Sequence, residues 1–117
     1  MIICSDMEEI NFDEKIIANY IEAIRPPEEM RHKLDVGYSF ENNEVVFFEI
    51  RPQWNDESII HHYPFVKAKY VKSQKKWKIY WMRANEKWEL YEPNPTVRNI
   101  NSFIEIVEED EHGYFRG

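Results

Sequence analysis

The chain has 117 residues, 43% of them hydrophobic and 32% charged, with a formal net charge of −7 at pH 7. This length suits about one domain with one core, and no apolar run approaches the ~20 residues that a membrane-spanning helix needs. The single cysteine excludes an intramolecular disulfide and a thiolate zinc cluster, and no signal-peptide pattern opens the chain. We therefore expect a cytoplasmic protein with no membrane partner.

The first predicted helix starts at Asn11, which is a suitable cap, with Glu14 positioned to complete a capping box. It ends at Pro26-Pro27 and carries an apolar stripe at helical spacing, made by Ile17, Tyr20, Ile21 and Ile24. Pro27 is also expected to open a second, short helix that runs through Leu34.

The period of the apolar residues changes to two at Asp35, which predicts a β-hairpin. Its strands should meet at Asn42-Asn43, because Asn tolerates the positive φ of a two-residue turn. The second strand is predicted from Val45 to Arg51. Residues 52–62, which include Trp54, are predicted to form the longest irregular connection of the chain.

Residues 63–92 predict a three-stranded antiparallel meander, with strands near 65–72, 76–83 and 87–92. A last helix is expected after Pro93-Asn94-Pro95, capped by Asn99 or Asn101. The predicted fold class is therefore α+β: an antiparallel sheet of about five strands, a hairpin plus a three-stranded meander, with N- and C-terminal helices packed on one face. Residues 1–10 are predicted to be a mobile acidic leader and residues 11–117 a single domain.

Several short strings resemble a bacterial family known as domain of unknown function 3024. They are Arg25-Pro26-Pro27, Leu34-Asp35, Phe48-Glu49-Ile50-Arg51-Pro52 with Trp54, Ala68-Lys69 with Tyr70 and Lys72, Trp77-Lys78 with Tyr80-Trp81-Met82-Arg83-Ala84, and Lys87-Trp88 with Tyr91 and Pro93. The resemblance runs from about Arg25 to the C-terminus, and the first helix and the leader fall largely outside it. It implies a small bacterial protein of one domain, without implying an activity, a cofactor or a catalytic residue.

The charge is distributed unevenly along the chain. Residues 67–87 contain eight basic residues and one acidic residue, so this segment carries +7 and the rest of the chain −14. Lysines interleaved with aromatic residues are typical of surfaces that bind single-stranded nucleic acid. The predicted ligand-binding residues are Lys67, Lys69, Tyr70, Lys72, Lys76, Lys78, Tyr80 and Arg83. In the alternative interpretation, the aromatic residues belong to the core and the lysines pair with acidic helices or protect the sheet edge.

Three functions follow from these patterns. The first is a non-enzymatic binding module for nucleic acid, another anionic ligand or an acidic protein. The second is a Mg²⁺-dependent nuclease of restriction-endonuclease-like type, with Asp35 and Glu49 as metal ligands and Arg51 as the nearby cation. In a hairpin that turns at Asn42-Asn43, however, Glu49 pairs near Val36 and is out of register with Asp35.

The third function is a protein-interaction domain, including a homodimer through the aromatic sheet face. The pair His61-His62 predicts a solvated loop better than a metal site, because adjacent strand residues point in opposite directions. No glycine-rich phosphate loop is present, and no cofactor is expected.

Overall fold

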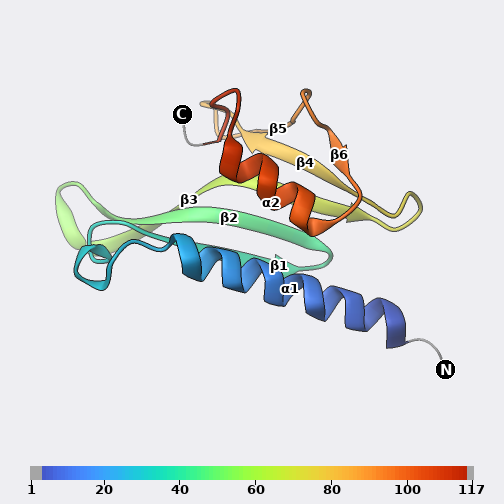
Figure 1. Cartoon of the computed structure of the whole chain (residues 1–117). Coiled ribbons are helices and arrows are strands. Elements are labelled where there is room, and N and C mark those ends of the chain that lie inside the picture. The colour runs from blue at the N-terminus through green and yellow to red at the C-terminus, as the bar shows by residue number, and fades with distance from the viewer. Residues whose placement is uncertain (1–3, 116–117) are drawn as a thin grey trace.

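The fold is an open, six-stranded antiparallel sheet with two α-helices on one face, as the computed structural model shows (Figure 1). The structure describes residues 4–115, and the side chains from Phe12 onward. The strands are β1 (Asp35–Glu41), β2 (Glu44–Gln53), β3 (Asp56–Val71), β4 (Lys76–Met82), β5 (Trp88–Leu90) and β6 (Thr96–Val97). Their order is β1-β2-β3-β4-β5, and β6 also pairs with β4. The predicted fold class and the position of both helices on one face are confirmed.

The helix α1 (Cys4–Ile24) begins well before the predicted cap at Asn11. The sequence between Cys4 and Ile24 contains neither Pro nor Gly, so nothing in it stops the helix from extending past a local capping signal. Most of the predicted acidic leader is therefore helical, and residues 1–3 lie outside the described residues. The predicted second helix is only one 3-10 turn, η1 (Glu28–Met30).

The first hairpin has the predicted turn. Asn42 and Asn43 adopt φ values of 52° and 62°, as a two-residue turn of the type favoured in hairpins requires. Glu41 consequently pairs with Glu44, Tyr38 with Phe47, and Val36 with Glu49.

The prediction of an irregular connection over residues 52–62 is wrong. β2 and β3 continue through this segment and turn near Trp54, and their hairpin projects at one end of the sheet (Figure 1). The ladder has register shifts at Phe47/Phe48 and at Pro52/Gln53, and proline is tolerated in strands at such irregularities. Pro52 and Pro64 are therefore both accommodated within paired strands.

The C-terminal part follows the prediction with small shifts. β5 is shorter than predicted, and the two-residue β6 is an additional strand. Asn99 caps α2 (Ile100–Glu109), and its side chain accepts a hydrogen bond of 2.9 Å from the Ser102 N–H. The helix ends at Asp110, which adopts a left-handed conformation.

The core lies between the sheet and the two helices, and Phe47 is its centre. This residue is fully buried, and its ring contacts the rings of Tyr20, Phe65 and Phe103 at centroid distances of 5.9, 6.4 and 5.3 Å. The contacts join α1, two strands and α2. Phe48, the next residue, is half-buried on the opposite face of β2.

A bidentate ion pair connects the end of α1 to the start of β1. Nε and Nη2 of Arg25 donate to the two Asp35 carboxylate oxygens at 3.0 and 2.8 Å, and the Val36 N–H donates to the same carboxylate at 2.8 Å. The Arg25 hydrogen bond is the main cause that holds the pKa of Asp35 below its usual range. The pair fixes the angle at which the chain enters the sheet.

We predict that Phe47→Ala lowers the free energy of unfolding by about 3–5 kcal/mol, because it leaves a cavity among three rings. Phe48→Ala is the matched control, since it removes the same group from the half-buried face and should cost clearly less. Chemical denaturation followed by circular dichroism measures both. Equal losses in the two variants would contradict the assignment of the two faces.

We also predict that Asp35→Asn lowers the melting temperature at pH 7 and that the difference from the unmodified protein shrinks as the pH falls. The folded-state pKa of Asp35 is lowered, so its contribution is complete above its unfolded pKa of about 4 and is lost as pH drops through the folded value. Melting curves from pH 7 to pH 2.5 test this. A difference that stays constant over this range would refute the role of the charged pair.

Candidate functional site

The face of the sheet opposite the helices carries a lysine surface, which we define as Lys67, Lys69, Lys76 and Lys78 together with Tyr80 and Trp88. Residues that pair directly across antiparallel strands lie on the same face. Lys67 pairs with Tyr80, and Lys69 pairs with Lys78. Met82, two residues after Tyr80, pairs with Trp88. The buried residues Ala68 and Ile79 occupy the alternate, helix-facing positions, so the helices do not cover the lysine surface.

Lys67 is the most enclosed cation of this surface. Its Nζ lies 4.8 Å from the centroid of the Tyr80 ring and 5.0 Å from that of Trp88, and it is 3.8 Å from a carboxylate oxygen of Glu44. The Lys67 side chain is only 16% exposed. Two aromatic faces and one carboxylate therefore hold a positive charge at a fixed position.

Lys69 and Lys78 stand directly opposite each other on neighbouring strands. Like charges in this position are destabilising, and both residues have exposed or half-exposed side chains. Glu44 flanks Lys69 on the other side, from β2. An anion bound above β3 and β4 would reduce the repulsion between the two lysines.

The structure separates the other predicted ligand-binding residues from this surface. Tyr70 faces the helices and contacts the buried Trp77 at 5.1 Å, so it is wrongly placed in the predicted surface. Lys72 lies at the exposed start of the β3–β4 turn. Arg83, beyond β4, pairs with Glu89 at 3.3 Å. Trp88 and Glu44 were not predicted, because their roles depend on cross-strand register and not on their own sequence neighbourhood.

The candidate nuclease residues do not come together. Asp35 pairs with Ile50, whereas Glu49 pairs with Val36, which places the two carboxylates on opposite faces of the hairpin. Asp35 is bound by Arg25, and Glu49 forms an ion pair with Arg51. One Mg²⁺ ion must be within about 2.1 Å of both carboxylates, and this arrangement does not provide such a position.

The histidines are dispersed as well. His61 is 3.0 Å from the Gln53 amide oxygen, and His62 stacks on Phe48 with a centroid distance of 4.6 Å. In the part of the chain that the structure describes, no group of three or more His, Cys, Asp or Glu side chains could hold a metal ion. Across residues 4–115, no helix is long and apolar enough to cross a membrane.

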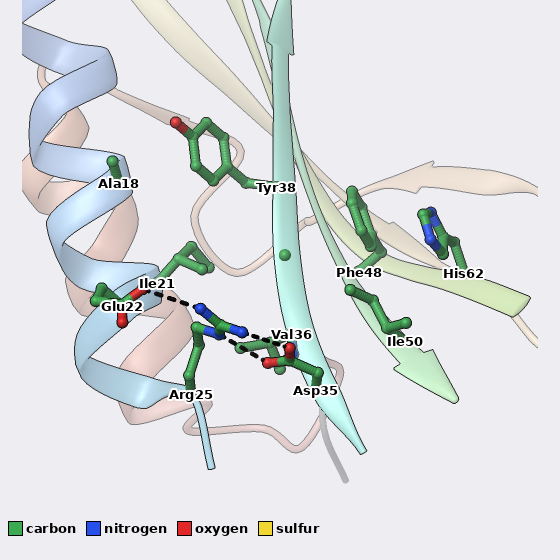
Figure 2. Close-up of a pocket in the computed structure, with 11 residues that line it drawn as sticks. Ala18, Ile21, Glu22, Arg25, Asp35, Val36, Tyr38, Phe48, Ile50 and His62 are labelled. Carbon is green, nitrogen blue, oxygen red and sulfur yellow. Dashed lines mark hydrogen bonds and ion pairs between the residues drawn. The ribbon is translucent and has the colours of Figure 1, made fainter. Parts of the chain in front are cut away.

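A second feature is an open groove of about 420 Å³ at the edge of the sheet. Figure 2 shows that it lies beside β1, between α1 and the strand. Ala18, Ile21 and Glu22 form its helix wall. Phe48, Ile50 and His62 lie on the far side of β1 and complete the lining. No sequence motif marks this groove, because its walls come from segments that the fold brings together.

A model of the family described as Domain of unknown function (DUF3024) matches residues 5–117. The match includes α1, which the sequence resemblance had placed largely outside the family. No curated protein and no solved structure matches the chain. The chain therefore belongs to the DUF3024 family, over essentially its whole length.

Proposed function

We propose that this protein is a non-enzymatic binding module that holds single-stranded nucleic acid on its lysine surface. The observation that carries the proposal is the cross-strand placement of Lys69 opposite Lys78, with Lys67 and Tyr80 as the next pair. Glu44 pairs with Lys67, but Lys69 and Lys78 still stand opposite each other on an uncovered sheet face, and an anionic ligand would relieve their repulsion.

The spacing of the lysines suits a polymer with regularly repeated charges. Alternate residues along a strand are about 6.7 Å apart and neighbouring strands about 4.8 Å apart. Lys67 and Lys69 on β3 and Lys76 and Lys78 on β4 therefore form a two-dimensional array of cations. An extended strand that crosses this array would place successive phosphates near successive ammonium groups.

The aromatic residues favour nucleic acid over an acidic protein as the ligand. Tyr80 and Trp88 lie on the same face as the lysines and are both partly exposed. Bases stack on aromatic rings without sequence preference, at about 1–3 kcal/mol per base. An acidic protein would use the cations but would gain much less from the rings. The acidic remainder of the chain and its single cysteine suit the cytoplasmic, bacterial setting that we propose for it.

We predict that the chain binds a labelled oligodeoxythymidylate and that log K falls linearly with log salt, with a slope near −3 for about four phosphate contacts. Lys69→Glu with Lys78→Glu should abolish this binding at low salt. Lys15→Glu with Lys33→Glu makes the same change in net charge at exposed lysines outside the surface. Fluorescence anisotropy measures all three proteins. If both double variants weakened oligonucleotide binding equally, the binding would depend on net charge alone, and the proposal would be overturned.

We predict separately that Tyr80→Ala weakens binding of the oligonucleotide by about 1–3 kcal/mol, while the salt slope stays the same, because a stacking contact releases no counterions. Tyr63→Ala is the control, since Tyr63 is 46% exposed but lies on the projecting hairpin. If Tyr80→Ala bound like the unmodified protein, the ligand would be an anion other than nucleic acid.

A further inference from the structure

We propose that the free edge of β1 binds an extended peptide as an additional strand, and that this peptide alternates basic with apolar residues. The site is distinct from the lysine surface, because β2 separates β1 from β3, the nearest strand of that surface. It combines an unprotected strand edge, a groove along that edge and a set of acidic groups near it.

The two edges of the sheet differ in how they are protected. The edge beyond β4 is divided between β5 and β6, which have three and two residues. β1 has seven residues, DVGYSFE, without proline, lysine or a bulge in its pairing with β2. Proteins usually shorten or charge an edge strand to prevent pairing, so the β1 edge is the one that remains able to pair.

The backbone of β1 has hydrogen-bonding groups directed away from β2. The two-residue turn makes Glu41 and Glu44 a hydrogen-bonded pair, and the alternation along the ladder then turns the N–H and C=O groups of Val36, Tyr38 and Phe40 outward. The Val36 N–H is held by the Asp35 carboxylate. No hydrogen bond from the described residues reaches the outward groups of Tyr38 or Phe40, so these groups can receive a strand.

The groove supplies contacts for the side chains of that strand. A hypothetical Cβ on Gly37 would lie 2.9 Å from Cε2 of Phe48, so the Phe48 ring occupies the space above Gly37 and reaches across β1 toward its edge. An added strand would run about 4.8 Å from β1. Its residue opposite Gly37 would therefore face Phe48, and the groove lining adds Ile50 and His62 on this side. Apolar peptide residues fit here.

In the added strand, the residues before and after the one opposite Gly37 point toward α1. The groove lining on that side is partly acidic. The Glu22 carboxylate is 66% exposed and is 3.3 Å from Arg25, whose guanidinium Asp35 also binds. These three lining groups sum to −1, and the Glu22 carboxylate is the most exposed of them. A Lys or Arg of the peptide can lay its stem along Ala18 and bring its head to Glu22.

The same charges disfavour a second copy of this chain as the occupant. In a symmetric antiparallel pairing centred on Tyr38, Asp35 of one copy would stand opposite Glu41 of the other, twice in the same interface. Like charges directly opposite each other are destabilising. A peptide with apolar residues opposite Asp35 and Glu41 avoids the repulsion that this self-pairing would create.

The test is an array of seven-residue peptides that alternate Lys or Arg with Val, Ile, Leu, Phe or Tyr, with Glu in place of the basic residue as the comparison. We expect binding by members of the basic set and none by the acidic set. Each binding peptide is then made in two N-methylated forms, on odd or on even residues. Only one form blocks the N–H groups that face β1, so one should bind at least tenfold more weakly and the other should bind like the parent.

Two pairs of protein variants locate the site. Ala18→Trp fills the groove and should abolish binding, whereas Asn19→Trp places the same ring on the exposed neighbouring position and should not. Glu22→Lys should weaken the basic peptides at least tenfold, and Ala23→Lys should have little effect. Amide exchange by NMR adds a readout that does not depend on a variant, because the Tyr38 and Phe40 N–H groups should become protected when peptide binds.

Three results would overturn the proposal. The first is the absence of binding across the whole array at low salt. The second is equal binding by both N-methylated forms, which would show that no strand is added to the edge. The third is a concentration-dependent dimer in analytical ultracentrifugation that Ala18→Trp abolishes, which would assign the β1 edge to a second copy of the chain.

Discussion

The two-residue turn at Asn42-Asn43 is the constraint on which the rest of the structure depends. It fixes β1 against β2, and β2 in turn pairs with β3, and β3 with β4. A slip of one residue would move every side chain of β1 to the opposite face. The positive φ values of the two asparagines therefore determine that Phe47 enters the core, that Phe48 leaves it, and that Asp35 and Glu49 lie on opposite faces.

The sheet separates two kinds of chemistry because only one of its faces is covered. The helix side is apolar and aromatic, and none of the described residues on it is both buried and charged. The uncovered side carries cations near β3 and β4 and apolar groups near β1 and β2. The ligands that we propose for the two regions accordingly differ in charge, an anion at the lysine surface and a basic peptide at the β1 edge.

Local patterns were sufficient to predict much of the fold. The alternation after Asp35, the asparagine turn and a helix cap at Asn99 or Asn101 each depend on a few neighbouring residues. The first two are confirmed, and of the two candidate caps the structure has Asn99. The long β2–β3 hairpin was missed because Pro52 is a strand breaker by local criteria. Its tolerance depends on a register shift that involves the partner strand.

The candidate site was predictable only in part, for the same reason. The cluster of lysines near residues 67–78 was evident from the sequence. The register of β3 and β4 then shows that four of these lysines share one face. Alternation also puts Tyr70 on the face opposite Lys69, so its inclusion in the surface was an avoidable error. Trp88 joins the surface through its pairing with Met82, which alternation within one strand does not reveal. The groove beside β1 depends on where α1 packs against the sheet, and no pattern within either segment specifies that distance.

The length of β3 has a consequence for how the molecule unfolds. One half of this 16-residue strand, near Val66 and Ala68, is buried in the core, whereas the half near Ile59 and Ile60 pairs only with β2 and is exposed. The free energy of local opening follows the apolar surface that a segment buries. The projecting hairpin therefore forms a low-stability cooperative unit that opens while the rest of the sheet stays folded, and its tip at Trp54 is the natural position for proteolytic cleavage or for insertion of foreign sequence.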